Sequence, residues 1–166
     1  MYNLMFNRLV RFSLSVLFVF SFLSTLHAAV PNPHGEVLLL EKIVRTGYVL
    51  EEHAFQMECR VTAKKVFVNF RKQGLKKSIE LDKNVNPKAE NLIIAAAKGN
   101  ITSRVAPADI GDLIYLAHMP NPNDSFTQID LGSTLDSRTI TENDSPEAFE
   151  LRTLLDSVCD EALRAF

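Results

Sequence analysis

Residues 55–62 alternate strictly between apolar and polar side chains, and this pattern constrains the fold more than any other feature of the chain. Phe55, Met57, Cys59 and Val61 point to one side of an extended segment, and polar residues separate them. Such alternation is typical of a strand that buries one face in an antiparallel sheet. The sequence therefore predicts a sheet with one covered and one solvated face.

Neighbouring segments extend this strand into a meander. Residues 66–70 are rich in β-branched and aromatic side chains, and alternation resumes at Leu75, after the Gln73-Gly74 break, and continues to residue 82. An earlier strand is expected within residues 36–45, where the start of the segment is apolar on both faces, as in a central strand. These segments predict three to four strands joined by short turns.

A helix is predicted over residues 87–98, because Asn86 can cap it, Pro87 suits the first helical position and Gly99 follows its end. Residues 100–111 contain a proline and show no hydrophobic period, so we expect a loop there. The remaining predicted strands cover residues 113–117, 126–131 and 136–141, and Gly132-Ser133 is expected to join the last two.

The strongest helix signal begins at Ser145, which can cap a helix that Pro146 opens. Apolar side chains then recur at the spacing of a core-facing helix. They are Leu151, Leu154, Leu155, Val158, Cys159, Ala162 and Phe166. The predicted fold class is α+β: an antiparallel meander of three to four strands, a helix, two to three further strands, and a C-terminal helix packed on the sheet.

The first 28 residues have the three parts of a secretory signal peptide. Arg8 and Arg11 precede an apolar run over residues 12–23, and small residues follow. That run is shorter than the roughly 20 residues of a transmembrane helix, which argues against an uncleaved anchor. Cleavage is expected after Ala28 or Ala29. The mature part, residues 29–166, is then a single exported domain, periplasmic or extracellular, with no stable membrane anchor.

Two cysteines occur in the chain, Cys59 and Cys159, and both lie on predicted buried faces. Export places them in an oxidising compartment, where such a pair usually forms a disulfide. We therefore expect a bridge between the meander and the last helix. Two buried reduced cysteines, or a reactive or metal-binding pair, are the alternatives, although the spacing matches no CxxC redox or zinc pattern.

Charge is unevenly distributed along the mature chain, which has 16 basic and 20 acidic residues once the two leader arginines are removed. Residues 59–104 carry 11 basic and three acidic side chains, whereas residues 105–166 carry three basic and twelve acidic ones. One interpretation is that the halves pack together and their fields partly cancel. The other is an electropositive face that binds an anionic protein or polymer. The candidate surface consists of Arg60, Arg71, Lys72, Lys76 and Lys77.

Catalytic and metal-binding patterns are weak. His34, His53 and His118 could serve as bases, but the sequence contains no GxSxG, HExxH or SxxK motif and no glycine-rich phosphate loop. Glu51-Glu52-His53 has no second ligand cluster to support it. No cofactor, metal, catalytic residue or nucleic-acid partner is predicted, and no family signature is recognised. Asn100, Asn123 and Asn143 match the N-glycosylation pattern, which matters only in a host that glycosylates exported proteins.

The leading hypothesis is therefore a non-enzymatic exported binding module with a basic sheet face. A protease inhibitor is the first alternative, because Arg104 and Val105 in the expected 99–111 loop could enter a trypsin-like pocket. A small exported hydrolase that uses His53 or His118 is the second. The ligand and the oligomeric state do not follow from these residues.

Overall fold

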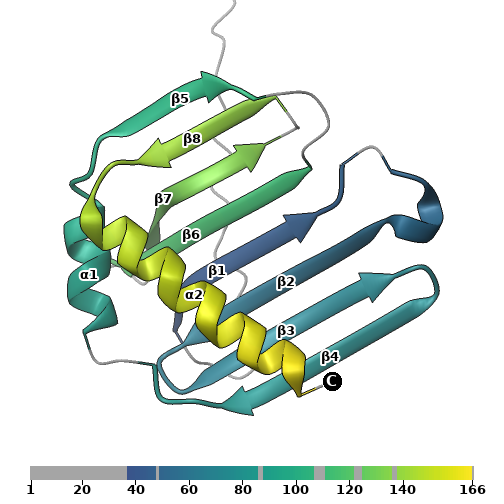
Figure 1. Cartoon of the computed structure of the whole chain (residues 1–166). Helices are drawn as coiled ribbons and strands as arrows, with labels where there is room; N and C mark the ends of the chain where they lie inside the picture. The colour runs from purple at the N-terminus through teal and green to yellow at the C-terminus, as the bar shows by residue number, and fades with distance from the viewer. Residues whose placement is uncertain are drawn as a thin grey trace, which may run out of the picture.

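In the part of the chain that the structure describes, eight antiparallel strands form one sheet in the order β4-β3-β2-β1-β6-β7-β8-β5 (Figure 1). The structure is a computed structural model, and it describes residues 37–47, 49–85, 88–106, 111–121, 125–135 and 138–165. The predicted leader and its cleavage site lie outside these residues.

The first four strands form the predicted meander. They are β1 (Leu38–Arg45), β2 (Phe55–Thr62), β3 (Lys65–Lys72) and β4 (Leu75–Asp82). A short 3-10 turn, η1 (Glu51–His53), precedes β2. Gln73 and Gly74 connect β3 to β4, and Gly74 has a φ of 72°, which glycine adopts without strain. β1 lies between β2 and β6, so the expectation of a central first strand is confirmed.

The second half of the sheet contains one or two more strands than predicted. They are β5 (Ile101–Val105), β6 (Asp112–Pro120), β7 (Phe126–Leu135) and β8 (Thr139–Asn143). The predicted loop over residues 100–111 was wrong at residues 101–105, where β5 forms the edge of the described sheet and pairs with β8, whereas residues 107–110 lie outside the described residues. Every residue of β5 is exposed, so the strand has no buried side that could give it a hydrophobic period.

The predicted break at Gly132-Ser133 was also wrong, because β7 runs through both residues to Leu135. The register between β6 and β7 shifts between Tyr115 and Leu116, so the strand accommodates an irregularity there instead of turning. Gly132, with a φ of 134°, supplies a backbone conformation that other residues rarely adopt. Glycine in a strand therefore indicated a bulge and not a turn.

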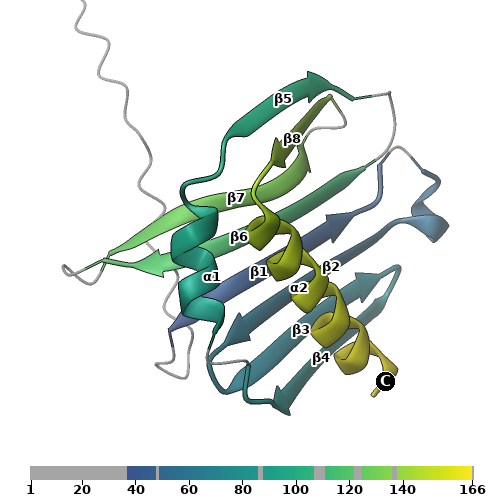
Figure 2. The ribbon, with the colours of Figure 1, turned by 60° about the vertical axis from the view of Figure 1, so that its left-hand side comes forward.

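Two helices pack on one face of the sheet and contact each other (Figures 1 and 2). α1 (Ala89–Ala96) is shorter than the predicted 87–98, and the expected cap, Asn86-Pro87, lies outside the described residues. α2 (Pro146–Arg164) begins as predicted, with the Ser145 hydroxyl accepting a hydrogen bond from the Ala148 amide at 3.1 Å. The main core lies between α2 and the strands. It includes the fully buried side chains of Leu40, Val61, Leu131, Leu151 and Leu155.

The disulfide between Cys59 and Cys159 is confirmed and joins β2 to α2, with 6.0 Å between the Cα atoms. Neither cysteine is a free thiol or a metal ligand, so both alternative interpretations of the pair were wrong. A disulfide is consistent with export, because it persists in oxidising compartments. None of the described helices is both long and apolar enough to cross a membrane.

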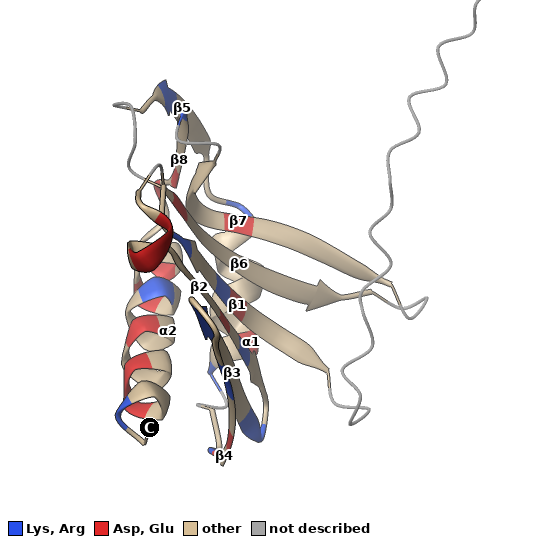
Figure 3. Cartoon of the chain, turned by 90° about the vertical axis from the view of Figure 1, so that its right-hand side faces the viewer, with Lys and Arg blue, Asp and Glu red and all other residues tan. Residues whose placement is uncertain are grey.

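The opposite face of the sheet carries no described helix. Figure 3 shows the sheet nearly edge-on, with α2 on one side of it. Strand alternation assigns side chains to this uncovered face, because Cys59 and its neighbours at i±2 point toward α2 and the intervening residues point away. The side chains of the uncovered face are therefore not covered by either described helix.

Candidate anion-binding surface

A row of four polar side chains crosses one end of the uncovered face. In the strand register, Arg45 on β1 is opposite Gln56 on β2, Gln56 is opposite Arg71 on β3, and Arg71 is opposite Lys76 on β4. Residues that are directly opposite in antiparallel strands share one face, so the four side chains stand side by side. We call Arg45, Gln56, Arg71 and Lys76 the basic row.

The basic row borders a hollow of about 400 Å³ at the β3–β4 turn. Arg45, Arg71, Lys72 and Lys76 are among its lining residues, and no acidic residue is. Within the described part of the chain, no carboxylate lies within ion-pairing distance of Arg71, Lys72 or Lys76, whereas Arg45 has Asp112 at 3.6 Å. The hollow therefore presents cations whose charge the fold leaves largely uncompensated.

Arg71 and Lys76 form the most unusual pair in this row. Like charges directly opposite each other on one sheet face destabilise the strand pairing by a few tenths of a kcal/mol to about 1 kcal/mol. Nothing in the core requires the pair, because both side chains are exposed. An arrangement that costs stability at an exposed position is what a charged binding surface would show.

The other two residues of the predicted surface lie elsewhere. Arg60 is on the uncovered face but is bound in ion pairs with Glu41 and Glu58. Lys77 is opposite Phe70, which packs against the core, so it lies on the face that α2 covers. Lys72 lines the end of the hollow, but it is opposite Phe55 and so also belongs to the covered face, which leaves Arg71 and Lys76 as the predicted residues in the basic row.

A second group of charged side chains occupies the middle of the uncovered face. The Arg60 Nε donates to Glu41 Oε1 at 3.1 Å, and its guanidinium also contacts the Glu58 carboxylate. Glu41 Oε2 lies 3.5 Å from the His118 Nε2, which is longer than an ordinary hydrogen bond. That nitrogen is buried and has no hydrogen-bond partner in the described structure.

The two glutamates of this group shift in opposite directions. Burial raises the pKa of the Glu41 carboxyl, but the contacts with His118 and Arg60 outweigh it, and the net pKa is lowered. Burial raises the pKa of Glu58, and the neighbouring Glu41 charge adds to it despite the opposing charge of Arg60. Arg60 lowers the pKa of both carboxyls, but the net pKa falls only for Glu41, which also contacts His118.

Neither described candidate base, His53 or His118, lies beside a side chain that could act as a nucleophile. His53 is exposed in η1, and His34 lies outside the described residues. His118 is opposite Gln128 in the register and two residues from Leu116, so its neighbours on this face are not nucleophiles. No group of three potential metal ligands occurs among the described residues. The hydrolase hypothesis has no support in this geometry.

The two residues predicted to be inhibitory do not lie in a loop. Arg104 and Val105 belong to strand β5, and the Arg104 guanidinium contacts the Glu142 carboxylate at 3.3 Å on the neighbouring strand. A protease inhibitor of the expected kind needs a protruding segment, whereas these residues are held in the sheet. The observation that motivated the inhibitor hypothesis was therefore wrong.

The charge asymmetry along the chain is only partly neutralised by packing. Lys42 on β1 binds Asp156 on α2 at 2.6 Å, and Lys83 contacts Glu161. Tyr115 donates to the same Asp156 at 2.9 Å, and burial together with that bond raises the pKa of the tyrosine well above its ordinary value. The Lys83–Glu161 pair joins the basic and acidic halves, and neither ion pair includes a residue of the basic row.

Two residues of the uncovered face, Arg45 and Glu41, were not predicted from the sequence. Arg45 is near the end of the first predicted strand, and only the register of β1 with β2 brings it beside Gln56. Glu41 gave a usable signal, because it follows four apolar residues in a segment predicted to be central. A carboxylate in such a position needs a partner.

Comparison of the chain with protein-family models, with curated proteins and with solved structures found no match. The functional interpretation therefore depends on the geometry described above.

Proposed function

We propose that the mature chain is a non-enzymatic binding module of the periplasm or the extracellular space, and that its basic row binds an extended anionic polymer. The observation that supports this proposal is the row itself. With Gln56, the cations Arg45, Arg71 and Lys76 cross four adjacent strands, at a hollow whose lining contains no acidic residue.

The length of the row favours a polymer over a small anion. Four strands are separated by three spacings of about 4.8 Å, so the cations extend over about 14 Å. A single phosphate or carboxylate could contact only neighbouring side chains such as Arg71 and Lys76. A chain with regularly spaced carboxylates or sulfates could engage Arg45 at the same time, and each additional contact would tighten binding.

Fluorescence anisotropy with labelled polyglutamate and labelled heparin tests this proposal, and inorganic phosphate serves as a competitor. We expect both polymers to bind, with affinity that falls as salt shortens the Debye length. Phosphate should compete only weakly. The stronger of the two polymers would identify whether carboxylate or sulfate chemistry is preferred.

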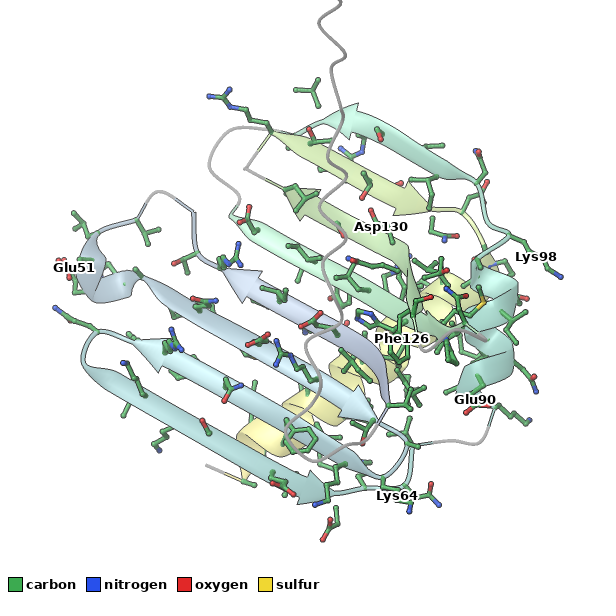
Figure 4. All side chains as sticks on the ribbon, turned by 180° about the vertical axis from the view of Figure 1, so that it is seen from behind. Glu51, Lys64, Glu90, Lys98, Phe126 and Asp130 are labelled. Atoms are coloured by element: carbon green, nitrogen blue, oxygen red, sulfur yellow. A yellow bond between two sulfur atoms is a disulfide. The ribbon has the colours of Figure 1, made fainter. Side chains whose placement is uncertain are left out.

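The decisive variant is Arg71→Glu with Lys76→Glu, which should weaken polymer binding at least tenfold. Lys64→Glu with Lys98→Glu is the matched control, because it changes the net charge equally at exposed positions outside the hollow. Figure 4 shows Lys64 and Lys98 at sites well separated from Glu51, which marks the η1 end of the sheet. Equal losses in both double variants would show general electrostatic attraction and refute the assigned site.

A further inference from the structure

A second hollow, of about 460 Å³, lies on the same uncovered face but on the β1–β6–β7 part of the sheet. Its volume is within the range of small-molecule sites, which is roughly 300–1,000 Å³. The lining combines an apolar floor with three polar groups. The apolar residues are Ile43, Ile114, Leu116 and Leu135, and the polar ones are Gln128, Asp130 and Ser133.

The strand register builds this hollow from two adjacent rows. In the first row Ile43, Ile114 and Ser133 are opposite one another, and in the second Leu116 is opposite Asp130. Isoleucine and leucine side chains thus form the floor at the centre of the sheet. A surface of this kind, bordered by a few fixed polar groups, is typical of a site for a ligand with an apolar body.

Asp130 is held in place by three donors. Its Oδ1 accepts from the Gly132 amide at 2.8 Å and from the Ser133 hydroxyl at 2.7 Å, and its Oδ2 accepts from the Thr141 hydroxyl at 2.5 Å. None of these donors is a cation, and no ion pair of Asp130 occurs within the described part of the chain. Figure 4, in which the uncovered face is toward the viewer, labels Asp130 on β7.

Next to this hollow, on the same face of β1 and β6, lie Glu41 and His118. Glu41 is opposite Leu116, and His118 is two residues beyond Leu116 on β6. Arg60 forms ion pairs with both Glu41 and Glu58. The His118 Nε2 is buried and lies 3.5 Å from Glu41 Oε2.

We propose that this hollow binds a small amphiphilic amine. The apolar body would lie on Ile114 and Leu116, and the protonated amine would donate to the fixed Asp130 carboxylate. Charge complementarity selects this class of ligand, because the only formal charge in the lining is negative. The inference is independent of the basic row, which contributes no residue to this hollow.

Calorimetry with three ligands of equal apolar length, octylamine, octanol and octanoate, tests the proposal at neutral pH. Octylamine should bind at least tenfold more tightly than the other two. Asp130→Asn should remove most of that preference, and Asp160→Asn, which removes an exposed charge from α2, should leave it unchanged. Equal binding of all three ligands, or an unchanged preference in Asp130→Asn, would overturn the proposal.

Leu116→Arg provides a second variant in case Asp130 is needed for folding. Leu116 is on the uncovered face, and an arginine there would fill the floor of the hollow and repel an amine. Octylamine binding should fall at least tenfold while the thermal unfolding temperature changes little. Binding that survives this substitution would place the amine elsewhere and contradict the inference.

Discussion

Arg71 and Lys76 are directly opposite each other on strands β3 and β4, both are exposed, and no described carboxylate forms an ion pair with either. If this like-charge pair binds an anionic polymer, replacing one of the two cations should stabilise the fold and weaken polymer binding. We predict that Lys76→Glu raises the free energy of unfolding by about 0.5 kcal/mol, because a repulsive cross-strand pair becomes attractive. The same variant should weaken polyanion binding.

Urea denaturation and fluorescence anisotropy on the same preparations measure the two effects. Lys64→Glu, at the β2–β3 turn, serves as the control and should change neither quantity substantially. A Lys76→Glu protein that is less stable, or that binds the polymer as well as the parent chain, would argue against a strained binding surface.

Asn143 connects four elements through one buried amide. Its Nδ2 donates to the Ala96 carbonyl at 3.0 Å and to the Asp130 carbonyl at 3.1 Å, and its Oδ1 accepts from the amide and hydroxyl of Ser145 at 3.1 and 2.8 Å. Asn143→Asp removes both donors and places a charge beside two carbonyls. We predict a loss of roughly 2–4 kcal/mol, measured by urea denaturation.

Asn100→Asp is the matched control, because Asn100 is exposed, and its stability should stay within about 0.5 kcal/mol of the parent. A glycan would have to be attached to the same Nδ2 atom of Asn143, so the folded chain cannot accept one there. Of the three acceptor patterns, Asn100 is exposed and Asn123 lies outside the described residues. A stability loss in Asn143→Asp no larger than in the control would refute this account.

The disulfide closes a loop with a sequence separation of 100 residues. In the chain-entropy model, such a bridge stabilises the folded state by about 4–5 kcal/mol, which is a large part of the 5–15 kcal/mol typical of a domain. Replacement of both Cys59 and Cys159 by alanine should therefore shift the urea midpoint strongly downward. The parent chain under reducing conditions should behave similarly, and a change below about 1 kcal/mol would contradict the prediction.

Glu41 and Glu58 should give stability opposite dependences on pH. The lowered pKa of Glu41 means that its contribution is present above the pKa of the unfolded chain and is lost as pH falls through the folded value. The raised pKa of Glu58 means that its favourable contribution is present at low pH and is lost as pH rises through its folded value.

Substitution by glutamine separates these two effects. Glu41→Gln should destabilise the chain at pH 7 by about 1.5–3 kcal/mol, because charged hydrogen bonds are lost, and by less at pH 4. Glu58→Gln should cost little or nothing at pH 7. Urea denaturation across this pH range measures both, and the same pH dependence in the two variants would show that the directions assigned here are incorrect.

Local patterns predicted the covered half of the fold well. The alternation around Cys59 and the apolar stripe around Cys159 each marked a buried face, and their meeting was predicted from the compartment in which thiols oxidise. β5 was missed because an exposed edge strand has no apolar side. Gly132 was misread because a glycine in a strand and a glycine in a turn give the same local signal.

The site depended more on register than on composition. Alternation correctly placed Arg71 and Lys76 on the solvated side, but the partner of each strand and its offset come from long-range pairing. The pairing of β1 with β2 places Arg45 in the basic row. The same pairing places Glu41 opposite Arg60, and because the two form an ion pair, Arg60 is not part of the binding surface. Such neighbours are not visible in a single strand.

The central claim, that the basic row is the binding surface, is tested most directly by nuclear magnetic resonance. Backbone amide shifts of the isotopically labelled mature chain would be followed while polyglutamate is added. The account predicts that the largest changes cluster at Arg45, Gln56 and the segment 71–76. Changes centred on another part of the chain, or none at polymer concentrations that saturate binding, would contradict it.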